Sequence, residues 1–325
     1  MQQGTIIGID IGGTKCAVAL GTADGRVQSR SAMATEVDRL TPQAVLERLA
    51  AMARDLLANA RDLPAPIGVG VSCGGPLDTK AGVMHSPPNM PEWKAVPVRA
   101  FFEKALALPV RVENDANATA LAEWRYGAGK GTRNFVFLTM GTGIGAGLIL
   151  DGKLYRGTND LAGELGHQTI LMNGPLCGCG KRGCLEALAS GPAIARLARE
   201  SMRYGRHKCV LALAGGKPAD ITAAHVVQAA NEGDPFGRQI LEEAGTYMGL
   251  GIANVIQMLN PERIALGTIA VHAGEHVLGP IRAAVAEYAW KRSADVCDIV
   301  AAALGDGAQD LAAISLWAGD DAPPR

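Results

Sequence analysis

Three cysteines, Cys177, Cys179 and Cys184, lie in one glycine-rich segment of eight residues. Nine residues separate Cys177 from His167. Three thiolates and one imidazole form a ligand set that suits tetrahedral Zn²⁺. Because the protein supplies all four ligands, no coordination position remains for a substrate, and we predict a structural zinc site. Free cysteines can instead be small buried hydrophobic residues, but a Cys-x-Cys-x₄-Cys run is typical of metal binding.

Two glutamates flank this predicted zinc loop, Glu164 three residues before the histidine and Glu186 two residues after the last cysteine. A carboxylate that is held on a rigid loop is a good acceptor for sugar hydroxyls. Either glutamate alone could be a solvated surface charge, but their position on both sides of the metal ligands favours binding. We therefore predict that the loop binds a carbohydrate in addition to zinc.

Two glycine turns each join one strand-like segment directly to another. Because glycine has no Cβ, its backbone N–H groups can approach an anion closely. Either turn alone could be an ordinary hairpin, but the two together favour binding of a polyphosphate. The predicted contacts are Asp10, Gly12, Gly13, Thr14 and Lys15 in the first turn and Thr139, Gly141, Thr142 and Gly143 in the second. Asp10, at a strand end, is expected to hold Mg²⁺ through water, because this ion gives up its waters reluctantly.

Two common nucleotide motifs are excluded by their context. Residues 141–146 satisfy the G-x-G-x-x-[GA] pattern of dinucleotide-binding proteins. That pattern must open a helix that receives the pyrophosphate, whereas here another strand follows directly. The nearest approach to a P-loop has Trp124 where the first glycine should stand.

The remaining segments alternate between helix and strand patterns, which predicts a mixed α/β fold. Thr41 and Pro42 are expected to open a helix, and Asp306 to cap a last helix that ends near Trp317. Strands are expected at residues 67–71, 110–115, 135–139, 148–150, 263–266 and 299–304, and helices at 115–123 and 237–259. The first strand–turn–strand unit recurs about 130 residues later, and this weak internal repeat predicts two related lobes.

The composition is that of a packed globular protein of 325 residues, with 48% hydrophobic and 19% charged residues. A formal net charge of −1 gives no electrostatic reason to expect a nucleic acid or a membrane surface as partner. The sequence shows neither a signal-peptide pattern nor an apolar run of about 18 residues, so no membrane-spanning helix is expected. Seven cysteines, three of them at metal-site spacing, fit a reducing compartment, and we predict a cytoplasmic protein.

Together these motifs resemble those of the ROK family of sugar kinases, repressors and uncharacterised reading frames, over nearly the whole chain. Residues 10–15 are similar to the family's first phosphate motif, 138–167 to its glycine-rich signature and 167–186 to its zinc motif. Residues 113–117 resemble the catalytic segment, and residues 260–267 the adenosine-side segment.

The resemblance implies a two-lobed, actin-like (ribonuclease H-like) fold that binds ATP, Mg²⁺ and a sugar in the cleft between lobes. The expected lobes are residues 1–117 plus 306–325, with the final helix packed on this lobe, and residues 118–305, which include the zinc loop 164–186. Asp115 would be the base that takes the proton from the attacking hydroxyl, although an aspartate there could also be a helix N-cap. The implied sugar-binding residues are Gly75, Asn89, Asn114, Asp115, Glu164, His167 and Glu186, and Gly267 joins the nucleotide-binding set. His167 would bind zinc through one ring nitrogen and the sugar through the other.

The implied activity is ATP-dependent phosphorylation of a hexose, with glucose expected because the Glu-x-Gly-His and Cys-x-Glu segments resemble glucokinase-type members. Kinases of N-acetylglucosamine or N-acetylmannosamine share these residues and are alternatives, as is a sugar-binding regulator without kinase activity. The family's repressors carry an N-terminal helix-turn-helix domain, whereas this chain begins at the phosphate strand and has no basic patch, so DNA binding is not expected. A homodimer is usual for similar proteins and is expected here.

One residue departs from the family's pattern. Members usually have a glycine pair after the late strand, where this chain has Gly267 and Thr268. Threonine resists a positive φ. We therefore expect this loop to have a different shape, with an effect on nucleotide binding.

Overall fold

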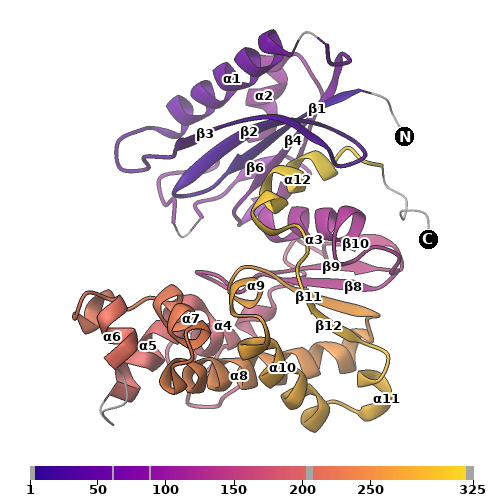
Figure 1. Ribbon diagram of the computed structural model, residues 1–325. Helices are drawn as coiled ribbons and strands as arrows, with labels where there is room; N and C mark the ends of the chain where they lie inside the picture. Colours follow the sequence, from indigo (N-terminus) through magenta and orange to yellow (C-terminus); the bar gives the residue numbers. More distant parts are fainter. Residues whose placement is uncertain (1–3, 61, 88, 203–207, 320–325) are drawn as a thin grey trace. The chain divides into compact units, whose positions relative to one another are not determined.

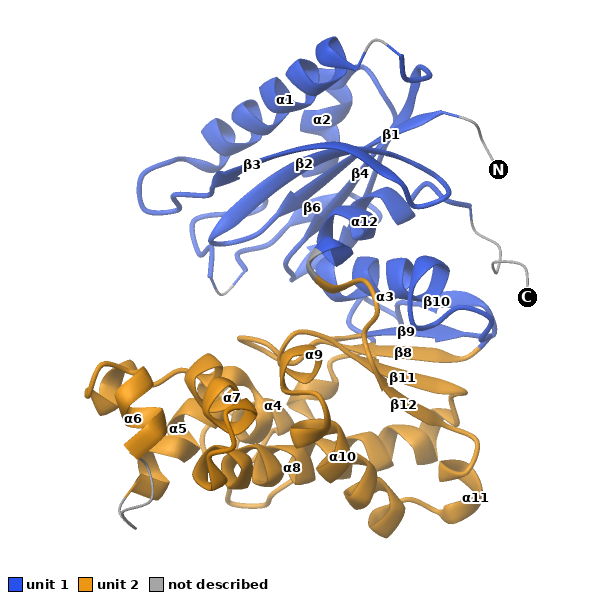
Figure 2. Cartoon of the chain, viewed as in Figure 1, with its two compact units in different colours: residues 1–133, 147–162, 306–325 blue, residues 134–146, 163–305 orange. Residues whose placement is uncertain are grey.

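The computed structural model of the chain describes residues 4–60, 62–87, 89–202 and 208–319 (Figure 1). The chain folds into two compact units: unit 1 comprises residues 1–133, 147–162 and 306–325, and unit 2 comprises residues 134–146 and 163–305 (Figure 2). We expected residues 118–133 and 147–162 in the second lobe. In the structure they pack with the first sheet and its helices and belong to unit 1.

A five-stranded sheet forms the centre of unit 1. Its strands are β1 (Thr5–Ile11), β2 (Lys15–Thr22), β3 (Val27–Ala34), β4 (Pro66–Cys73) and β7 (Val110–Asn114), in the order β3-β2-β1-β4-β7. The strands β1, β2 and β3 pair antiparallel, whereas β1, β4 and β7 are parallel to one another. The first glycine turn is therefore a hairpin between β1 and β2, as predicted. The short strands β5 (Leu77–Asp78) and β6 (Val83–Met84) form a separate antiparallel pair.

A second five-stranded sheet repeats this strand order. It contains β8 (Phe135–Leu138), β9 (Ala146–Leu150), β10 (Lys153–Tyr155), β11 (Arg263–Leu266) and β12 (Asp298–Ala301), in the order β10-β9-β8-β11-β12. As in the first sheet, the strand before the glycine turn is followed by two parallel strands, here β11 and β12. The predicted internal repeat is confirmed at the level of topology. The last strand ends at residue 301, three residues before its expected end.

Helices cover both faces of the first sheet (Figure 1). The helices α1 (Pro42–Asn59) and α2 (Val98–Leu106) lie on one face, and α3 (Asp115–Tyr126) and α12 (Ala308–Ser315) on the other. Alternation along β1 explains this arrangement, because successive side chains of a strand point to opposite faces. Ile7 and Ile9 share a core with Leu46 of α1, whereas Ile6 packs with Ile314 of α12.

Glycines in the strands make room for α12. A Cβ on Gly70 would lie 1.9 Å from the carbonyl oxygen of Ala313, and one on Gly8 would lie 3.0 Å from the side chain of Ile314. The final helix thus packs on the N-terminal sheet, as expected. Its start was predicted wrongly: its N-cap residue is Gly307 rather than Asp306, because a 3₁₀ turn at residues 305–307 precedes the helix.

Unit 2 consists largely of helices. They are α4 (Leu185–Ala189), α5 (Gly191–Ser201), α6 (Lys208–Leu213), α7 (Ala223–Asn231), α8 (Pro235–Leu259), α9 (Ile269–Ala273), α10 (Glu275–Tyr288) and α11 (Lys291–Ala294). The expected alternation of helix and strand is wrong for residues 185–259, whose described part contains helices and turns. Glycines on α8 permit helix-on-helix packing instead, since a Cβ on Gly249 would lie 2.6 Å from the carbonyl oxygen of Ile281 on α10.

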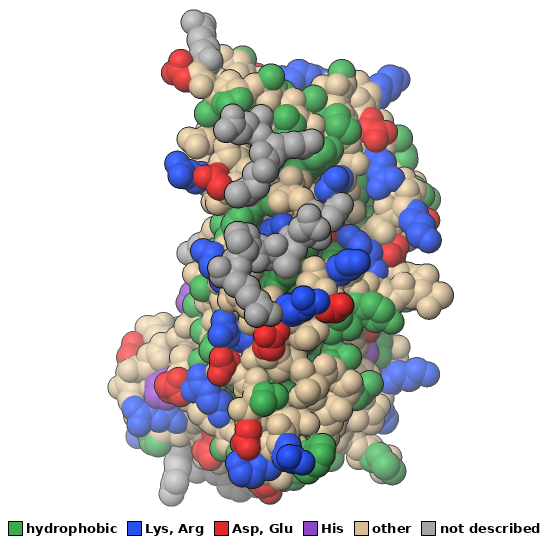
Figure 3. Space-filling view, turned by 90° about the vertical axis from the view of Figure 1, so that its right-hand side faces the viewer, with side chains coloured by type: hydrophobic (Ala, Val, Ile, Leu, Met, Phe, Trp, Pro, Cys, Tyr) green, Lys and Arg blue, Asp and Glu red, His purple; other side chains and the backbone are tan. Residues whose placement is uncertain are grey.

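Across the described ranges, no helix combines the length and the apolar character needed to cross a bilayer. On the face shown in Figure 3, Lys and Arg side chains are mixed with Asp and Glu side chains and with small hydrophobic groups. This mixture agrees with the formal net charge of −1.

Candidate active site

Three polar side chains lie next to one another across the parallel strands of unit 1. Asp10 on β1 is the register partner of Ser72 on β4, and Ser72 is the partner of Glu113 on β7. All three strands end one residue later, so the segments that follow them emerge at the same edge of the sheet. This edge brings together the predicted residues that follow β1, β4 and β7, including Gly75 and Asp115.

The carboxyl group of Asp10 lies in an environment that disfavours its charged form. Burial raises the pKa of Asp10 to about 7, and the carboxylates of Asp115 and Asp310 act in the same direction. A hydrogen bond from Ser72 and the charge of Arg30 oppose the shift, and Arg30 also donates to Asp310 at 2.7 Å. A divalent cation would relieve the repulsion among these carboxylates, so the site suits the Mg²⁺ expected at Asp10.

Asp115 is the first residue of α3, and Asn114 is the residue that caps this helix. The Oδ1 atom of Asn114 accepts hydrogen bonds from the backbone N–H groups of Ala116, at 3.0 Å, and Asn117, at 3.4 Å. The alternative role of Asp115 as the N-cap is therefore wrong. Its side chain is exposed at the helix N-terminus, and its Oδ1 atom accepts a hydrogen bond of 2.8 Å from the backbone N–H of Ala116.

Glu113 is not among the predicted site residues, yet it fixes the backbone that carries Asn114 and Asp115. Its side chain is buried, and Oε1 accepts hydrogen bonds from the backbone N–H of Asn114, at 3.0 Å, and from Nδ2 of Asn117, at 3.1 Å. The Oε2 atom accepts from both Nε and Nη2 of Arg156, each at 2.7 Å. A buried carboxylate is costly unless it is paired, and Arg156 supplies the pairing charge.

Two predicted sugar-binding amides lie over glycines of unit 1. A Cβ on Gly13 would lie 2.6 Å from Nδ2 of Asn89, and a Cβ on Gly75 would lie 3.2 Å from Nδ2 of Asn114. Since both turns lack side chains at these positions, the amides can approach the backbone closely. The structure thus brings Asn89 to the first glycine turn and Asn114 to the turn after β4.

The first glycine turn exposes the residues that were predicted to contact phosphate. It is closed by a hydrogen bond of 3.2 Å from the backbone N–H of Gly12 to the carbonyl oxygen of Lys15. The Thr35 hydroxyl donates to the carbonyl oxygen of Gly12 at 2.6 Å. Thr14 and Lys15 are exposed, so their side chains are accessible to an anionic ligand.

The second glycine turn follows β8 in unit 2 and is closed by its own hydrogen bonds. The backbone N–H of Thr139 donates to the carbonyl oxygen of Gly145, and the N–H of Gly145 donates to the Thr139 hydroxyl, each at 2.9 Å. The N–H of Gly141 donates to the carbonyl oxygen of Gly143 at 3.0 Å. The Thr139 hydroxyl therefore supports the turn, while Thr142 is exposed at its tip.

Glu186 connects the predicted zinc loop to this turn. Its Oε2 atom accepts a hydrogen bond of 3.0 Å from the backbone N–H of Ile144. A Cβ on Gly143 would lie only 2.8 Å from the same oxygen, so the approach of the carboxylate requires glycine there. The other oxygen, Oε1, lies 3.7 Å from Sγ of Cys177. Glu186 thus has a partner at each oxygen within unit 2.

The four predicted zinc ligands form one cluster. His167, Cys177, Cys179 and Cys184 each place a ligand atom within 4.8 Å of the others. The distance is 3.7 Å from Sγ of Cys177 to Nδ1 of His167 and also from Sγ of Cys179 to Sγ of Cys184. Two sulfurs on a tetrahedral ion with Zn–S bonds of about 2.3 Å are about 3.8 Å apart, so the geometry fits zinc. Burial raises the pKa of the Cys177 thiol to about 12, so a bound cation would be needed to hold it as a thiolate.

The two ring nitrogens of His167 face different partners. Nδ1 faces Cys177, and Nε2 lies 3.8 Å from a carboxylate oxygen of Glu164. Both His167 and Glu164 are exposed, at a 3₁₀ turn over residues 165–167. The structure therefore brings Glu164 and Nε2 of His167 together as accessible polar groups.

Thr268 adopts the backbone conformation that we expected threonine to resist. Its φ is 54° and its ψ is −106°, so the threonine does not keep this position out of the positive-φ region. Hydrogen bonds of 2.9 Å on both sides impose this conformation: the N–H of Gly267 donates to the Leu138 carbonyl, and the N–H of Ile269 donates to the Met140 carbonyl. A β-branched residue there is strained.

In both units, candidate residues lie beside glycine turns at the ends of parallel strands, an arrangement that suits phosphate-binding α/β proteins. The chain belongs to the ROK family, which matches residues 6–320. It is 36% identical to a glucokinase of Thermotoga maritima over 316 residues, which are 97% of this chain and 98% of that protein. These findings confirm the family resemblance.

Solved structures confirm the fold class. The structure is similar to that of a ROK family glucokinase from Streptomyces griseus in complex with glucose and AMPPNP, with a TM-score of 0.81 and 34% identity over 96% of this chain and 99% of that one. A xylose repressor of Caldicellulosiruptor bescii is 32% identical over 282 residues, which are 86% of this chain and 69% of that protein. The family relationship therefore includes kinases and repressors.

Replacing Thr268 by glycine should stabilise the protein. The change removes strain that costs of order 1–3 kcal/mol, against a loss of about 0.5–1 kcal/mol from the flexibility of glycine. We expect the free energy of unfolding, measured with urea, to rise by about 1 kcal/mol. Thr158→Gly, at an exposed loop position without a positive φ, is the control and should lower stability or leave it unchanged. A destabilised Thr268→Gly variant would show that the threonine is not strained.

Replacing Asp10 by asparagine should raise the free energy of unfolding of the metal-free protein relative to wild type, and this difference should increase as the pH rises. A carboxyl group whose pKa is about 7 in the folded state, against 3.8 ordinarily, contributes stability that is lost as the pH rises from about 4 to 7. Since asparagine does not ionise, its advantage over wild type in urea unfolding should grow by roughly 1–3 kcal/mol between pH 5 and pH 8. The control is Asp38→Asn, at an exposed position. An advantage of Asp10→Asn that does not change with pH would contradict the raised pKa.

Proposed function

We propose that this protein is an ATP-dependent kinase that transfers the γ-phosphoryl group of ATP to glucose and releases glucose 6-phosphate. The observation that carries the proposal is the similarity, over 96% of the chain, to a glucokinase structure determined with glucose and AMPPNP. The exposed Asp115 at the start of α3 and the two glycine turns provide the groups that such a reaction needs.

Asp115 is proposed as the base. As a sugar hydroxyl oxygen attacks the γ-phosphorus, the bond from phosphorus to the bridging oxygen of ADP breaks, and the hydroxyl proton passes to the carboxylate. The transition state of phosphoryl transfer is loose, so the proton leaves late and an ordinary carboxylate is sufficient. The network of Glu113 and Arg156 holds the backbone of this residue in place.

The sugar is proposed to contact Gly75, Asn89, Asn114, Asp115, Glu164, His167 and Glu186. The hydrogen bonds that these side chains already make within the protein indicate which of their polar atoms remain available to the sugar. Asn114 uses Oδ1 as the helix cap, which leaves Nδ2. His167 turns Nδ1 to the cysteines, which leaves Nε2 beside Glu164. Because Glu186 also accepts from Ile144, it would position the glycine turn while it binds the sugar.

The nucleotide is proposed to bind the two glycine turns together with Gly267. The backbone amides and exposed hydroxyls at Thr14 and Thr142 suit phosphate oxygens. Asp10, surrounded by other carboxylates, would hold Mg²⁺, which neutralises charge on the phosphates.

We further propose that the cluster of His167 and three cysteines holds Zn²⁺ as a structural ion. With four protein ligands, the ion would fix the loop that carries Glu164 and Glu186 and take no part in the chemistry. The loop would then hold its polar groups in place before the sugar arrives, which reduces the ordering cost of binding.

Other substrates and properties extend this proposal. Kinases of N-acetylglucosamine or N-acetylmannosamine are the alternative activities, and they would be identified by a higher kcat/KM for those sugars than for glucose. A regulator without kinase activity would release no ADP with any sugar. We also propose a cytoplasmic homodimer, on the family resemblance and on the seven unpaired cysteines, which suit a reducing compartment.

Replacing Asp115 by alanine should reduce kcat for glucose by about 10²–10⁴-fold, because the general base is lost. The measurement is ADP release with Mg²⁺-ATP and saturating glucose. Asp55→Ala, at another exposed helical aspartate of unit 1, is the matched control and should keep wild-type turnover. Unchanged unfolding temperatures would show that both variants are folded. A kcat for Asp115→Ala within threefold of wild type would remove this residue from the mechanism.

A further inference from the structure

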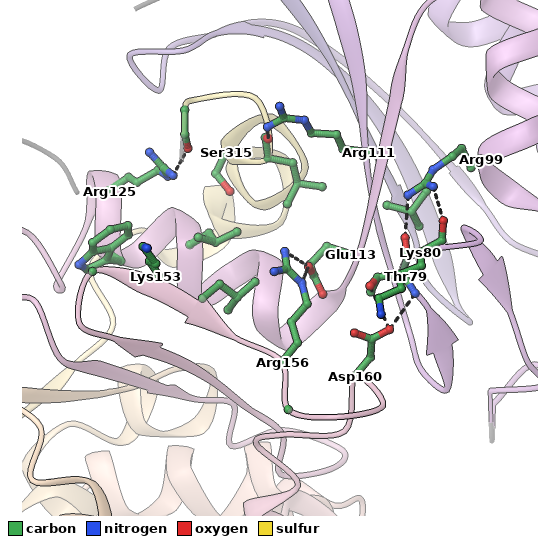
Figure 4. A pocket seen from close by; sticks show the side chains of 18 residues that line it. Thr79, Lys80, Arg99, Arg111, Glu113, Arg125, Lys153, Arg156, Asp160 and Ser315 are labelled. Carbon is green, nitrogen blue, oxygen red and sulfur yellow. Dashed lines mark hydrogen bonds and ion pairs between the residues drawn. The ribbon is translucent and has the colours of Figure 1, made fainter. Parts of the chain in front are cut away.

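Unit 1 contains a cavity whose wall includes none of the predicted catalytic or substrate-binding residues (Figure 4). Its volume is about 790 Å³, which is the size of small-molecule pockets in proteins. The wall is formed by the segment after β5, by parts of α2, β7 and α3, by β10 with the segment that follows it, and by the end of α12.

The charged side chains of this wall are mostly basic. The basic residues are Lys80, Arg99, Arg111, Arg125, Lys153 and Arg156, and the acidic residues are Glu113 and Asp160. The lining therefore has a formal excess of four positive charges. A concave surface with charge of one sign raises the local concentration of oppositely charged ligands.

Both carboxylates of the wall already have partners. Glu113 is paired with Arg156 at 2.7 Å, and Figure 4 shows the guanidinium pointing toward this carboxylate. The Oδ2 atom of Asp160 accepts hydrogen bonds from the backbone N–H of Thr79, at 3.0 Å, and from its hydroxyl, at 2.9 Å. These interactions leave the positive charge of Arg99 without an acidic partner among the lining residues.

Arg99 is held in place by uncharged groups. Its Nη1 and Nη2 atoms donate to the backbone carbonyl oxygens of Lys80, at 2.5 Å, and Thr79, at 2.6 Å. Its Nε atom is buried and has no hydrogen-bond partner among the described residues. Carbonyl groups orient the guanidinium without cancelling its charge. Arg99 is thus a positioned cation whose charge no acidic residue of the wall cancels, which is the kind of group that binds oxyanions.

We propose that this cavity binds a small molecule that carries a phosphoryl dianion, and that Arg99 contacts the phosphoryl oxygens. The exposed side chains of Lys80 and Lys153 would supply further positive charge. The positive charges of Arg99, Lys80 and Lys153 attract a dianion more strongly than a monocarboxylate. Val112, Leu121 and Leu316 also line the cavity, so an organic group attached to the phosphate would find apolar contacts.

This binding site does not depend on the proposed kinase activity, because its wall shares no residue with the proposed nucleotide and sugar contacts. Arg156 is unsuitable for testing it, since its loss would also release Glu113 beside Asn114. Arg99 donates to carbonyl oxygens of the segment after β5, and Lys80 and Lys153 are exposed. These three residues can therefore be changed without releasing Glu113.

The test is calorimetric titration of inorganic phosphate into the full-length protein in the presence of saturating glucose and Mg²⁺-AMPPNP, which occupy the proposed substrate site. Wild type should bind phosphate, and acetate should bind at least tenfold more weakly. Arg99→Met should weaken phosphate binding by about tenfold or more, the effect of one charge-assisted hydrogen bond. The Lys80→Met/Lys153→Met double variant, changed at exposed positions only, should also weaken it and carries the test if Arg99→Met does not fold.

Matched controls separate this cavity from general surface charge. Arg54 donates to a backbone carbonyl oxygen, as Arg99 does, but lies outside the cavity, so Arg54→Met should bind phosphate as wild type does. No detectable phosphate binding by wild type would overturn the proposal. It would also be overturned if the cavity variants bound phosphate as tightly as wild type, or if Arg54→Met weakened binding as much as Arg99→Met.

Discussion

The ligand atoms of His167 and three cysteines lie within 4.8 Å of one another, and this cluster is the constraint on which we propose that the loop of residues 164–186 depends. Between residues 165 and 184 the chain forms only a short 3₁₀ turn and isolated β-bridges, so regular secondary structure contributes little to its order. The same loop leads to Glu186, whose carboxylate accepts from Ile144 and approaches Gly143. A metal ion in the cluster would therefore order the predicted sugar contacts and support the second glycine turn at once.

Unit 1 is organised by the end of a parallel sheet rather than by a metal cluster. The register places Asp10, Ser72 and Glu113 side by side, and the two acids have different environments. Glu113 has Arg156 and amide donors, and it orders the segment that carries Asp115. Asp10 lies near other carboxylates and has a raised pKa, which favours its protonated form until a cation binds.

Apart from the cap expected at Asp306, local sequence patterns predicted the caps and turns, because these depend on neighbouring residues. The Thr41 cap of α1, the hairpin at Gly12 and the change from strand to helix at Asp115 are found as expected. Cysteine spacing likewise predicted the cluster of unit 2. Contacts between distant residues could not be predicted in this way: Arg156 is 43 residues from Glu113, and Arg30 is 280 residues from Asp310. The strain at Thr268 also follows from hydrogen bonds with another strand, which its own sequence context does not reveal.

The central claim is that a metal ion in the cluster orders the predicted sugar contacts. Measuring glucose binding before and after removal of the metal tests this claim most directly. The measurement is a calorimetric titration of glucose into protein whose zinc content has been determined, with Cys184→Ala compared to Cys209→Ala, a cysteine outside the cluster. Zinc should be present at about one ion per chain in wild type and in Cys209→Ala. Removal of the metal, or Cys184→Ala, should weaken glucose binding by at least tenfold, and returning zinc to the stripped wild type should restore it. Glucose binding of undiminished affinity in metal-free protein would contradict the account.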